Sequence, residues 1–153
     1  MNLFRTKSIE QMRETAAHSG MAKTLGAVDL ILLGIGPDDT PALCRKLAEK
    51  ILGLRVFRDE NDKMNRSLAD VGGSVLVVSQ FTLLASTRKG NRPSYIKAAP
   101  EAVSYPMYER FAARVAELLG REVMTGEFGA DMQVALVNDG PVTIWIDSKM
   151  RDC

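Results

Sequence analysis

The length and charge of the chain exclude several classes of protein. With 153 residues, of which 46% are apolar and 25% charged, the composition is that of one globular domain with a buried core. Twenty basic residues against nineteen acidic ones leave a formal net charge of +1, which disfavours a non-specific RNA coat protein and requires a local basic patch for any nucleic-acid contact. No apolar stretch reaches the roughly 20 residues that cross a bilayer, so we expect no membrane partner.

The cysteine and histidine content further narrows the chemistry. Cys44 and Cys153 have no disulfide-framework spacing, which indicates a reducing, cytoplasmic compartment. His18 is the single histidine, so neither a Ser-His-Asp triad nor a histidine-rich metal site can be assembled. We therefore expect an activity that uses no metal and no organic cofactor.

The first third of the chain predicts a buried strand followed by a helix. Residues 1–26 are polar and poorly periodic, and they are compatible with a short strand or a helix followed by a loop. Val28 to Ile35 has the composition of a buried strand. Thr40 is a favourable N-cap with Pro41 at the first helical position, and Gly53 is a stop signal. The apolar face of this helix consists of Leu43, Leu47 and Ile51.

The middle of the chain predicts two more strands, a long loop and a second helix. Leu54 to Phe57 begins one strand, and residues 74–81 form a central one. Ser86 to Pro100 is too long for a simple connector and is a candidate binding loop. The second helix is expected from Ser104 to Gly120, with Pro106 in its first turn. Its apolar face would contain Met107, Phe111, Val115 and Leu118.

The end of the chain alternates apolar and polar residues in two segments. Residues 131–137 and 142–147 both show this period of two, and an Asn-Asp-Gly-Pro link between them predicts an antiparallel pair. The expected fold class is α/β: one layered domain over residues 1–153, with mixed β-sheets and two main helices packed on sheet.

Polar residues at the end of the central strand form the first candidate site. Val75 to Val78 is apolar, and Ser79, Gln80, Phe81 and Thr82 follow it directly. Hydroxyl and amide side chains at a strand end often only cap the sheet. Oriented backbone N–H groups at such a place could instead stabilise the oxyanion that forms when an activated ester is cleaved.

Two further runs, combined with Ser79 to Leu83, carry a family resemblance. They are Phe128 to Val134 and the Asn-Asp-Gly-Pro-Val-Thr run at 138–143. Together the three runs resemble the D-aminoacyl-tRNA deacylase family, dimeric enzymes that hydrolyse D-amino acids from mischarged tRNA. The resemblance extends over about residues 28–147. It implies hydrolysis of the D-aminoacyl ester, with glycyl-tRNA as a further substrate.

The resemblance also implies roles for individual residues. Gln80, Phe81 and Thr82 would be catalytic, with the backbone N–H near Phe81 as the oxyanion donor. We expect Thr82 to position the substrate, because the sequence supplies no base to deprotonate its hydroxyl, and the terminal 2′-hydroxyl of the tRNA would assist. The substrate-binding residues would be Ser79, Met132, Gly140 and Pro141.

Gly140-Pro141 corresponds to the family's cross-subunit Gly-cis-Pro motif. A proline peptide bond is cis in only about 5% of cases, so the resemblance alone supports a cis bond here. In the family, this dipeptide enters the partner's active site, and its carbonyl oxygens leave space for a D-amino acid but not for an L side chain. The resemblance thus implies a homodimer with a filter for chirality.

A cluster of basic residues in the long loop is the best candidate for contact with tRNA. Arg88, Lys89 and Arg92 lie within five residues of one another, with Tyr95 nearby. An ordinary solvated loop is the alternative interpretation.

The N-terminal segment departs from the family pattern. The family opens with an apolar strand whose arginine helps to hold the Gly-Pro dipeptide, whereas residues 1–27 are atypical and offer only Arg5 as a substitute. This departure leaves two alternatives to the deacylase: a catalytically silent RNA-binding relative and a small-molecule ester hydrolase.

Overall fold

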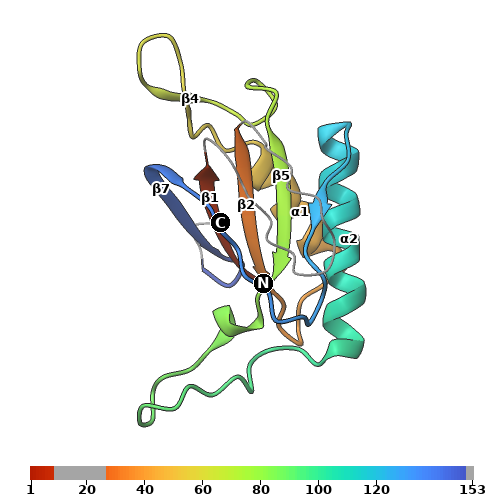
Figure 1. Cartoon of the computed structure of the whole chain (residues 1–153). Coiled ribbons are helices and arrows are strands. Elements are labelled where there is room, and N and C mark those ends of the chain that lie inside the picture. Colours follow the sequence, from red (N-terminus) through yellow and green to blue (C-terminus); the bar gives the residue numbers. More distant parts are fainter. Residues whose placement is uncertain (9–26, 151–153) are drawn as a thin grey trace.

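A five-stranded mixed sheet forms the centre of the molecule (Figure 1). The computed structural model describes residues 1–8 and 27–150, with residues 2–8 described as backbone. The strand order is β6-β5-β2-β1-β7. β1 runs antiparallel to both of its neighbours, and β2, β5 and β6 are parallel. The strands are β1 (Asn2–Ser8), β2 (Val28–Gly34), β5 (Ser74–Ser79), β6 (Met124–Thr125) and β7 (Asn138–Asp147).

The N-terminal segment forms strand β1, and its place in the sheet was not predicted. Of the two structures expected there, the chain forms a strand, and it is not peripheral: β1 lies between β2 and β7 and pairs with both. A first strand is therefore present although the local sequence did not indicate it clearly. His18 and the rest of residues 9–26, as well as Cys153, lie outside the described residues.

Helix α1 (Pro41–Leu52) confirms the predicted start and stop signals. Thr40 adopts an extended backbone, and its side chain accepts a hydrogen bond from the Leu43 N–H at 3.3 Å. Such a cap satisfies one of the N–H groups that a helix start leaves unpaired. Gly53 follows the last helical residue, as expected.

Helix α2 (Glu101–Leu119) begins three residues earlier than predicted. Pro106 consequently lies in the second turn, where it removes one helical N–H donor. The buried face includes the predicted Met107, Phe111 and Val115, but it contains Tyr108 instead of Leu118, which is 39% exposed.

The segments around the central strand differ in detail from the expectation. The strand predicted from Leu54 is reduced to β3 (Phe57–Arg58), which pairs with β4 (Met64–Arg66) in a separate two-stranded sheet. β5 ends at Ser79, two residues earlier than predicted. Phe81 begins the 3-10 helix η1 (Phe81–Leu84), so the chain turns away from the sheet at that point.

The predicted antiparallel pair at the end of the chain is wrong. Residues 131–137 form no strand, and β7 pairs with β1 instead. The partner of β7 thus comes from the other end of the chain, which local alternation cannot reveal. Asn138 to Pro141 belong to β7 and are not a turn between two strands.

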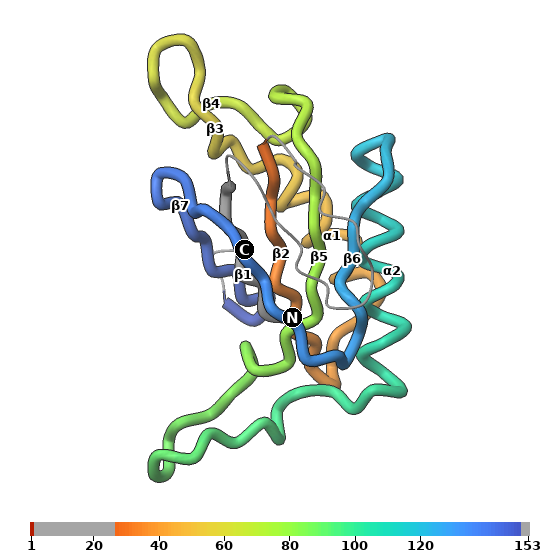
Figure 2. Tube along the Cα trace, viewed as in Figure 1, coloured from red at the N-terminus to blue at the C-terminus, as the bar shows by residue number. Residues whose placement is uncertain are grey.

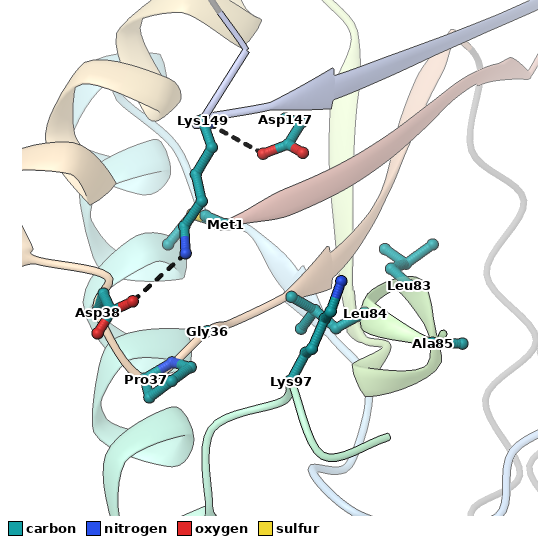
Figure 3. Close-up of a pocket in the computed structure, with 10 residues that line it drawn as sticks. All are labelled: Met1, Gly36, Pro37, Asp38, Leu83, Leu84, Ala85, Lys97, Asp147 and Lys149. Carbon is teal, nitrogen blue, oxygen red and sulfur yellow. Dashed lines mark hydrogen bonds and ion pairs between the residues drawn. The ribbon is translucent and has the colours of Figure 1, made fainter. Parts of the chain in front are cut away.

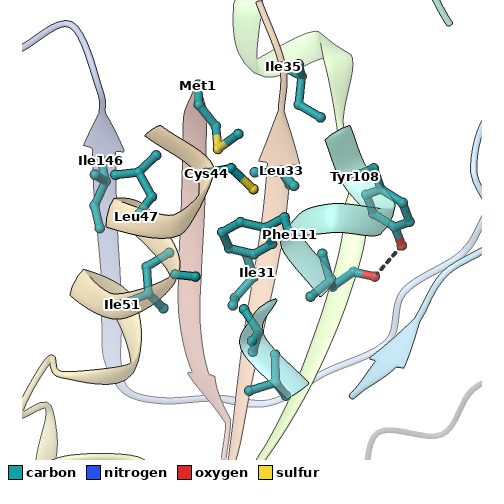
Figure 4. Packing of buried hydrophobic residues seen from close by; sticks show 14 of the residues in the cluster. Met1, Ile31, Leu33, Ile35, Cys44, Leu47, Ile51, Tyr108, Phe111 and Ile146 are labelled. Atoms are coloured by element: carbon teal, nitrogen blue, oxygen red, sulfur yellow. Dashed lines mark hydrogen bonds between the residues drawn. The ribbon is translucent and has the colours of Figure 1, made fainter. Parts of the chain in front are cut away.

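Both helices cover one face of the sheet, and the main core lies between them and the strands (Figures 1 and 4). Ile31 and Leu33 of β2 and Val75 and Val77 of β5 face Phe111 of α2 in this core. The opposite face carries a smaller cluster around Val28, Leu30 and Val78, which Met132 and Leu136 partly cover. No helix in the described part of the chain has the length and apolar character required to cross a membrane.

Candidate active site

The backbone after β5 is held tightly against the neighbouring strand. Ser79 pairs with Leu33, and the Gln80 N–H donates to the Leu33 carbonyl at 2.8 Å. A Cβ at Gly34 would lie only 3.0 Å from the Gln80 carbonyl oxygen and 3.2 Å from the Leu84 side chain. The absence of a side chain at Gly34 therefore allows η1 to pack directly on the end of β2.

The side chains of Gln80 and Thr82 are joined by a hydrogen bond. Gln80 Nε2 donates to Thr82 Oγ1 at 2.5 Å. This bond orients the hydroxyl but does not activate it, because an amide N–H cannot remove a proton. The arrangement favours the predicted positioning role for Thr82 over a nucleophilic one.

The start of η1 presents backbone donors. The N–H groups of Leu83 and Ala85 are bonded to the carbonyls of Gln80 and Thr82, at 3.2 and 3.1 Å. Within the described part of the chain, the N–H groups of Phe81 and Thr82 have no acceptor, as expected for the first groups of a helical turn. These two N–H groups are available to a developing oxyanion.

Met132 lies beside β5, near the end of the strand that leads into η1. It packs in the smaller apolar cluster with Val78, the residue before Ser79, and against Gly126, where a Cβ would come within 2.8 Å of the Met132 Sδ. Tyr108 holds Gly126 in place, because its hydroxyl lies 2.9 Å from the Val77 carbonyl and 3.1 Å from the Gly126 carbonyl. Burial raises the pKa of Tyr108 to about 12, so the hydroxyl keeps its proton for these bonds at neutral pH.

Gly140 and Pro141 project from the edge strand of the sheet. Thr143 pairs with Thr6 and Asn138 with Ser8, so the residues between them form a bulge in β7. Asn138 closes its base: its Nδ2 donates to Thr143 Oγ1 at 2.9 Å, and its Oδ1 accepts from the Val142 N–H at 3.2 Å. The Gly140–Pro141 peptide bond is cis, which confirms that expectation, and both residues are exposed.

The bulge and η1 lie at opposite ends of the sheet. Asn138 is level with Ser8, whereas Ser79 is level with Leu33 and therefore with Leu3, near the other end of β1. At about 3.4 Å per residue, the two motifs are separated by roughly 17 Å along the strands. Figure 1 shows η1 in green beside the N-terminus, at the end of the sheet where β1 begins. Gly140-Pro141 thus cannot reach Gln80, Phe81 or Thr82 of the same chain.

A recess of about 370 Å³ adjoins η1 (Figure 3). Leu83, Leu84 and Ala85 line it from the turn, and Lys97 and Lys149 contribute the cations. The predicted residues Ser79, Gln80 and Thr82 are not among its lining residues. They are half-buried, and Phe81 is exposed, so a single chain leaves this face of the site open.

The basic cluster lies in the loop that follows η1. Arg88, Lys89 and Arg92 are all exposed, and none has an ion-pair partner among the residues that the structure describes. The loop extends from the same end of the sheet as η1 (Figure 2). The structure therefore places free cations on the side of the molecule that carries the candidate site.

Comparison with known proteins identifies the family. The model of the D-Tyr-tRNA(Tyr) deacylase family matches residues 13–147. The chain belongs to this family. A D-aminoacyl-tRNA deacylase from Akkermansia muciniphila is 53% identical over 94% of this chain and 97% of its own length. One from Chromobacterium violaceum is 56% identical over 82% of this chain and 83% of its own.

Solved structures of similar fold support the deacylase architecture. A structure described as c-Myc DNA Unwinding Element Binding Protein has a TM-score of 0.83 and 32% identity, covering 97% of this chain and 99% of its own. A probable eukaryotic D-amino acid tRNA deacylase has a TM-score of 0.76 and covers 95% and 99% of the two chains. At 17% identity, this second likeness shows the fold alone.

Two residues that support the site of this deacylase-family chain were not predicted from the sequence. Asn138 was part of a recognised run, but its closure of the bulge depends on side-chain geometry. Tyr108 connects α2 to two backbone carbonyls. It lies three residues before Phe111, on the buried face of the helix, but was not among the residues predicted there. Among the described residues, no group of three or more His, Cys, Asp or Glu could hold a metal ion. The structure describes Arg5, the expected support for Gly140-Pro141, only as backbone.

Proposed function

We propose that this protein hydrolyses the ester bond of D-aminoacyl-tRNA and releases the free D-amino acid and tRNA. The family match over residues 13–147 carries this proposal. The η1 turn would supply the chemistry. The N–H groups of Phe81 and Thr82, which have no acceptor among the described residues, would stabilise the oxyanion, and Thr82, held by Gln80, would position the substrate. The adjacent 2′-hydroxyl of the tRNA would assist. Cytoplasm is the compartment that fits both the cysteine content and a translation substrate.

A second copy of the chain would complete the site. Because Gly140-Pro141 cannot reach η1 within one chain, the dipeptide would enter the partner's site in a homodimer. Exposed apolar side chains close to β7, those of Val134, Val137 and Trp145, provide a surface for such an association. The dipeptide's carbonyl groups would admit a D-amino acid or glycine and collide with an L side chain.

The activity is tested by deacylation of matched substrates. The purified protein should hydrolyse D-Tyr-tRNA at least about a hundredfold faster than L-Tyr-tRNA, a difference of about 2.7 kcal/mol in transition-state stabilisation. Glycyl-tRNA should be hydrolysed as well. Binding of tRNA without hydrolysis would identify the silent RNA-binding relative. Hydrolysis of simple esters with no dependence on the tRNA would identify the small-molecule hydrolase.

The basic loop should contribute to capture of the tRNA. Replacement of Arg88, Lys89 and Arg92 by alanine should weaken tRNA binding about tenfold or more at low salt and flatten its salt dependence, because fewer counterions are released. Filter binding over a range of salt concentrations measures both quantities. A control with Arg45, Lys50 and Arg110 replaced, all exposed on the two helices, should retain the parent salt slope. Equal slopes for the two triple variants would indicate an ordinary solvated loop.

Catalysis should require neither a metal ion nor a histidine. Treatment with a chelator and the substitution His18→Ala should each leave the D-aminoacyl-tRNA deacylation rate within about threefold of the parent, or less than about 0.7 kcal/mol. The expectation rests on oxyanion donors that are backbone N–H groups. A hundredfold loss in either experiment would contradict it.

A further inference from the structure

An exposed aromatic pair, formed by Phe81 and Tyr95, lies at the candidate site. The side chain of Phe81 is 56% exposed and that of Tyr95 is 40% exposed. Their ring centroids are 5.1 Å apart with an interplanar angle of 76°. This edge-to-face geometry leaves outer ring faces open, whereas large aromatic side chains normally lose most of their surface to the core. The pair connects the η1 turn to the basic loop.

The backbone of the loop fixes the position of Tyr95. Ser86 and Ser94 exchange two hydrogen bonds of 2.8 and 2.9 Å, which close the loop directly before Tyr95. After it, the Ala98 N–H donates to the Tyr95 carbonyl at 2.9 Å, and the Ala99 N–H donates to the Ile35 carbonyl at 2.8 Å. Tyr95 thus lies at the anchored base of the loop, unlike Arg88 and Lys89 near its tip. A ring presented from an anchored base loses little conformational entropy on binding.

Unpaired cations flank the aromatic pair. Lys97 is exposed two residues after Tyr95, and Arg92 lies three residues before it. Neither has an ion-pair partner among the described residues. Exposed aromatic rings next to cations that can follow a phosphate backbone are the combination by which proteins bind single-stranded nucleic acid.

We propose that the aromatic pair binds an unpaired base at the acceptor end of the tRNA, with the base stacked on Tyr95 and Lys97 contacting the adjacent phosphate. This inference rests on the proposed function, because the acceptor end is the single-stranded part of that substrate and must reach η1. Tyr95 is in this view a binding residue that does not touch the reacting ester. Stacking requires only a ring face, so the contact tolerates any base.

Uncharged tRNA tests the inference without requiring hydrolysis. Binding is measured for full-length tRNA and for the same tRNA lacking its three terminal nucleotides, which removes the terminal unpaired bases. Tyr95→Leu removes the ring and leaves a smaller apolar side chain, and Tyr95→Phe keeps the ring. Ile96→Ala is the matched control, because Ile96 is the next residue and is 88% exposed.

The ring of Tyr95 should strengthen tRNA binding only when the three terminal nucleotides are present. Tyr95→Leu should weaken binding of full-length tRNA about tenfold, or about 1.4 kcal/mol, and leave binding of the truncated tRNA unchanged. Tyr95→Phe and Ile96→Ala should both bind the full-length tRNA like the parent. Lys97→Ala should weaken full-length binding and reduce its salt slope by about one.

Two kinds of result would overturn the proposal. One is that Tyr95→Leu changes the affinity for full-length and for truncated tRNA by the same factor, including no change in either. The other is a change of oligomeric state in Tyr95→Leu, measured by light scattering, which would show that the aromatic pair contacts a second copy of the chain. Failure of the parent protein to hydrolyse D-aminoacyl-tRNA would contradict the proposed function separately, since these binding measurements contain no ester.

Discussion

Gly140→Ala is expected to lower the rate of D-aminoacyl-tRNA deacylation about a hundredfold, which corresponds to about 2.7 kcal/mol. Gly140 has a φ of +119°, in the region that L side chains rarely adopt. A Cβ there would meet the Val142 Cγ2 at 2.6 Å and the Val142 N at 3.1 Å. The bulge must therefore move, and with it the carbonyl groups that are proposed to line the partner's site.

The measurement is single-turnover deacylation of D- and L-aminoacyl-tRNA by parent and variant. Gly72→Ala is the matched control, because Gly72 also has a positive φ, of 64°, but has nothing within 4 Å of the position of its Cβ. Gly72→Ala should lower the stability of the fold somewhat and leave the deacylation rate unchanged. If Gly140→Ala remains folded and retains both the parent rate and the parent ratio of D to L rates, the chirality filter lies elsewhere.

Asp39→Asn is expected to destabilise the fold by about 3 to 5 kcal/mol, the range for breaking a buried ion pair. Asp39 Oδ1 lies 2.7 Å from the α-ammonium group of Met1, and the two side chains are 1% and 0% exposed. Asp39 Oδ2 accepts from the Gly36 N–H at 2.7 Å. Asparagine has only one acceptor oxygen, so its NH₂ group would face one of these two donors. The ammonium also donates to Ser148 Oγ at 2.7 Å, so the pair joins the start of β1 to the residue after β7.

The test compares the thermal unfolding of Asp39→Asn with that of Asp38→Asn. Asp39→Asn should lower the Tm by about 10 °C, at about 2–4 °C per kcal/mol for a chain of this size. Asp38→Asn removes the same charge, but Asp38 is 80% exposed and lies 3.4 Å from Lys149 Nζ. Its loss should cost less than about 1 kcal/mol. Equal shifts for the two variants would show that burial of the ion pair contributes nothing to stability.

The elements that the sequence predicted well are those governed by local chemistry. The limits of α1 follow from Thr40, Pro41 and Gly53, and a cap acts within one turn of the chain. The strand at 28–34 follows from its continuous apolar character, which is typical of a strand buried on both faces. The residues of η1 and the cis peptide bond at Gly140 were recognised through the family resemblance, and periodicity alone gave neither.

The features that the sequence did not predict depend on contacts between distant segments. Residues 131–137 alternate like a strand, but β7 pairs with β1, from the other end of the chain, and that pairing is set by the assembled sheet. Leu118 has the right spacing for the core of α2, yet it is 39% exposed near the end of the helix. Tyr108 is buried with its hydroxyl against two backbone carbonyl acceptors, which its place in the sequence does not reveal. A polar residue enters a core only where such partners exist.

The sequence by itself determined the main strands and helices and the motifs that mark the family, because apolar pattern and turn chemistry act over a few residues. Only the tertiary structure decided where those motifs lie. It placed Ser79 to Thr82 at one end of the sheet and Gly140-Pro141 at the other, because each strand's register is set by hydrogen bonds to its neighbours. It also brought Tyr95 onto Phe81 through the closed base of the loop.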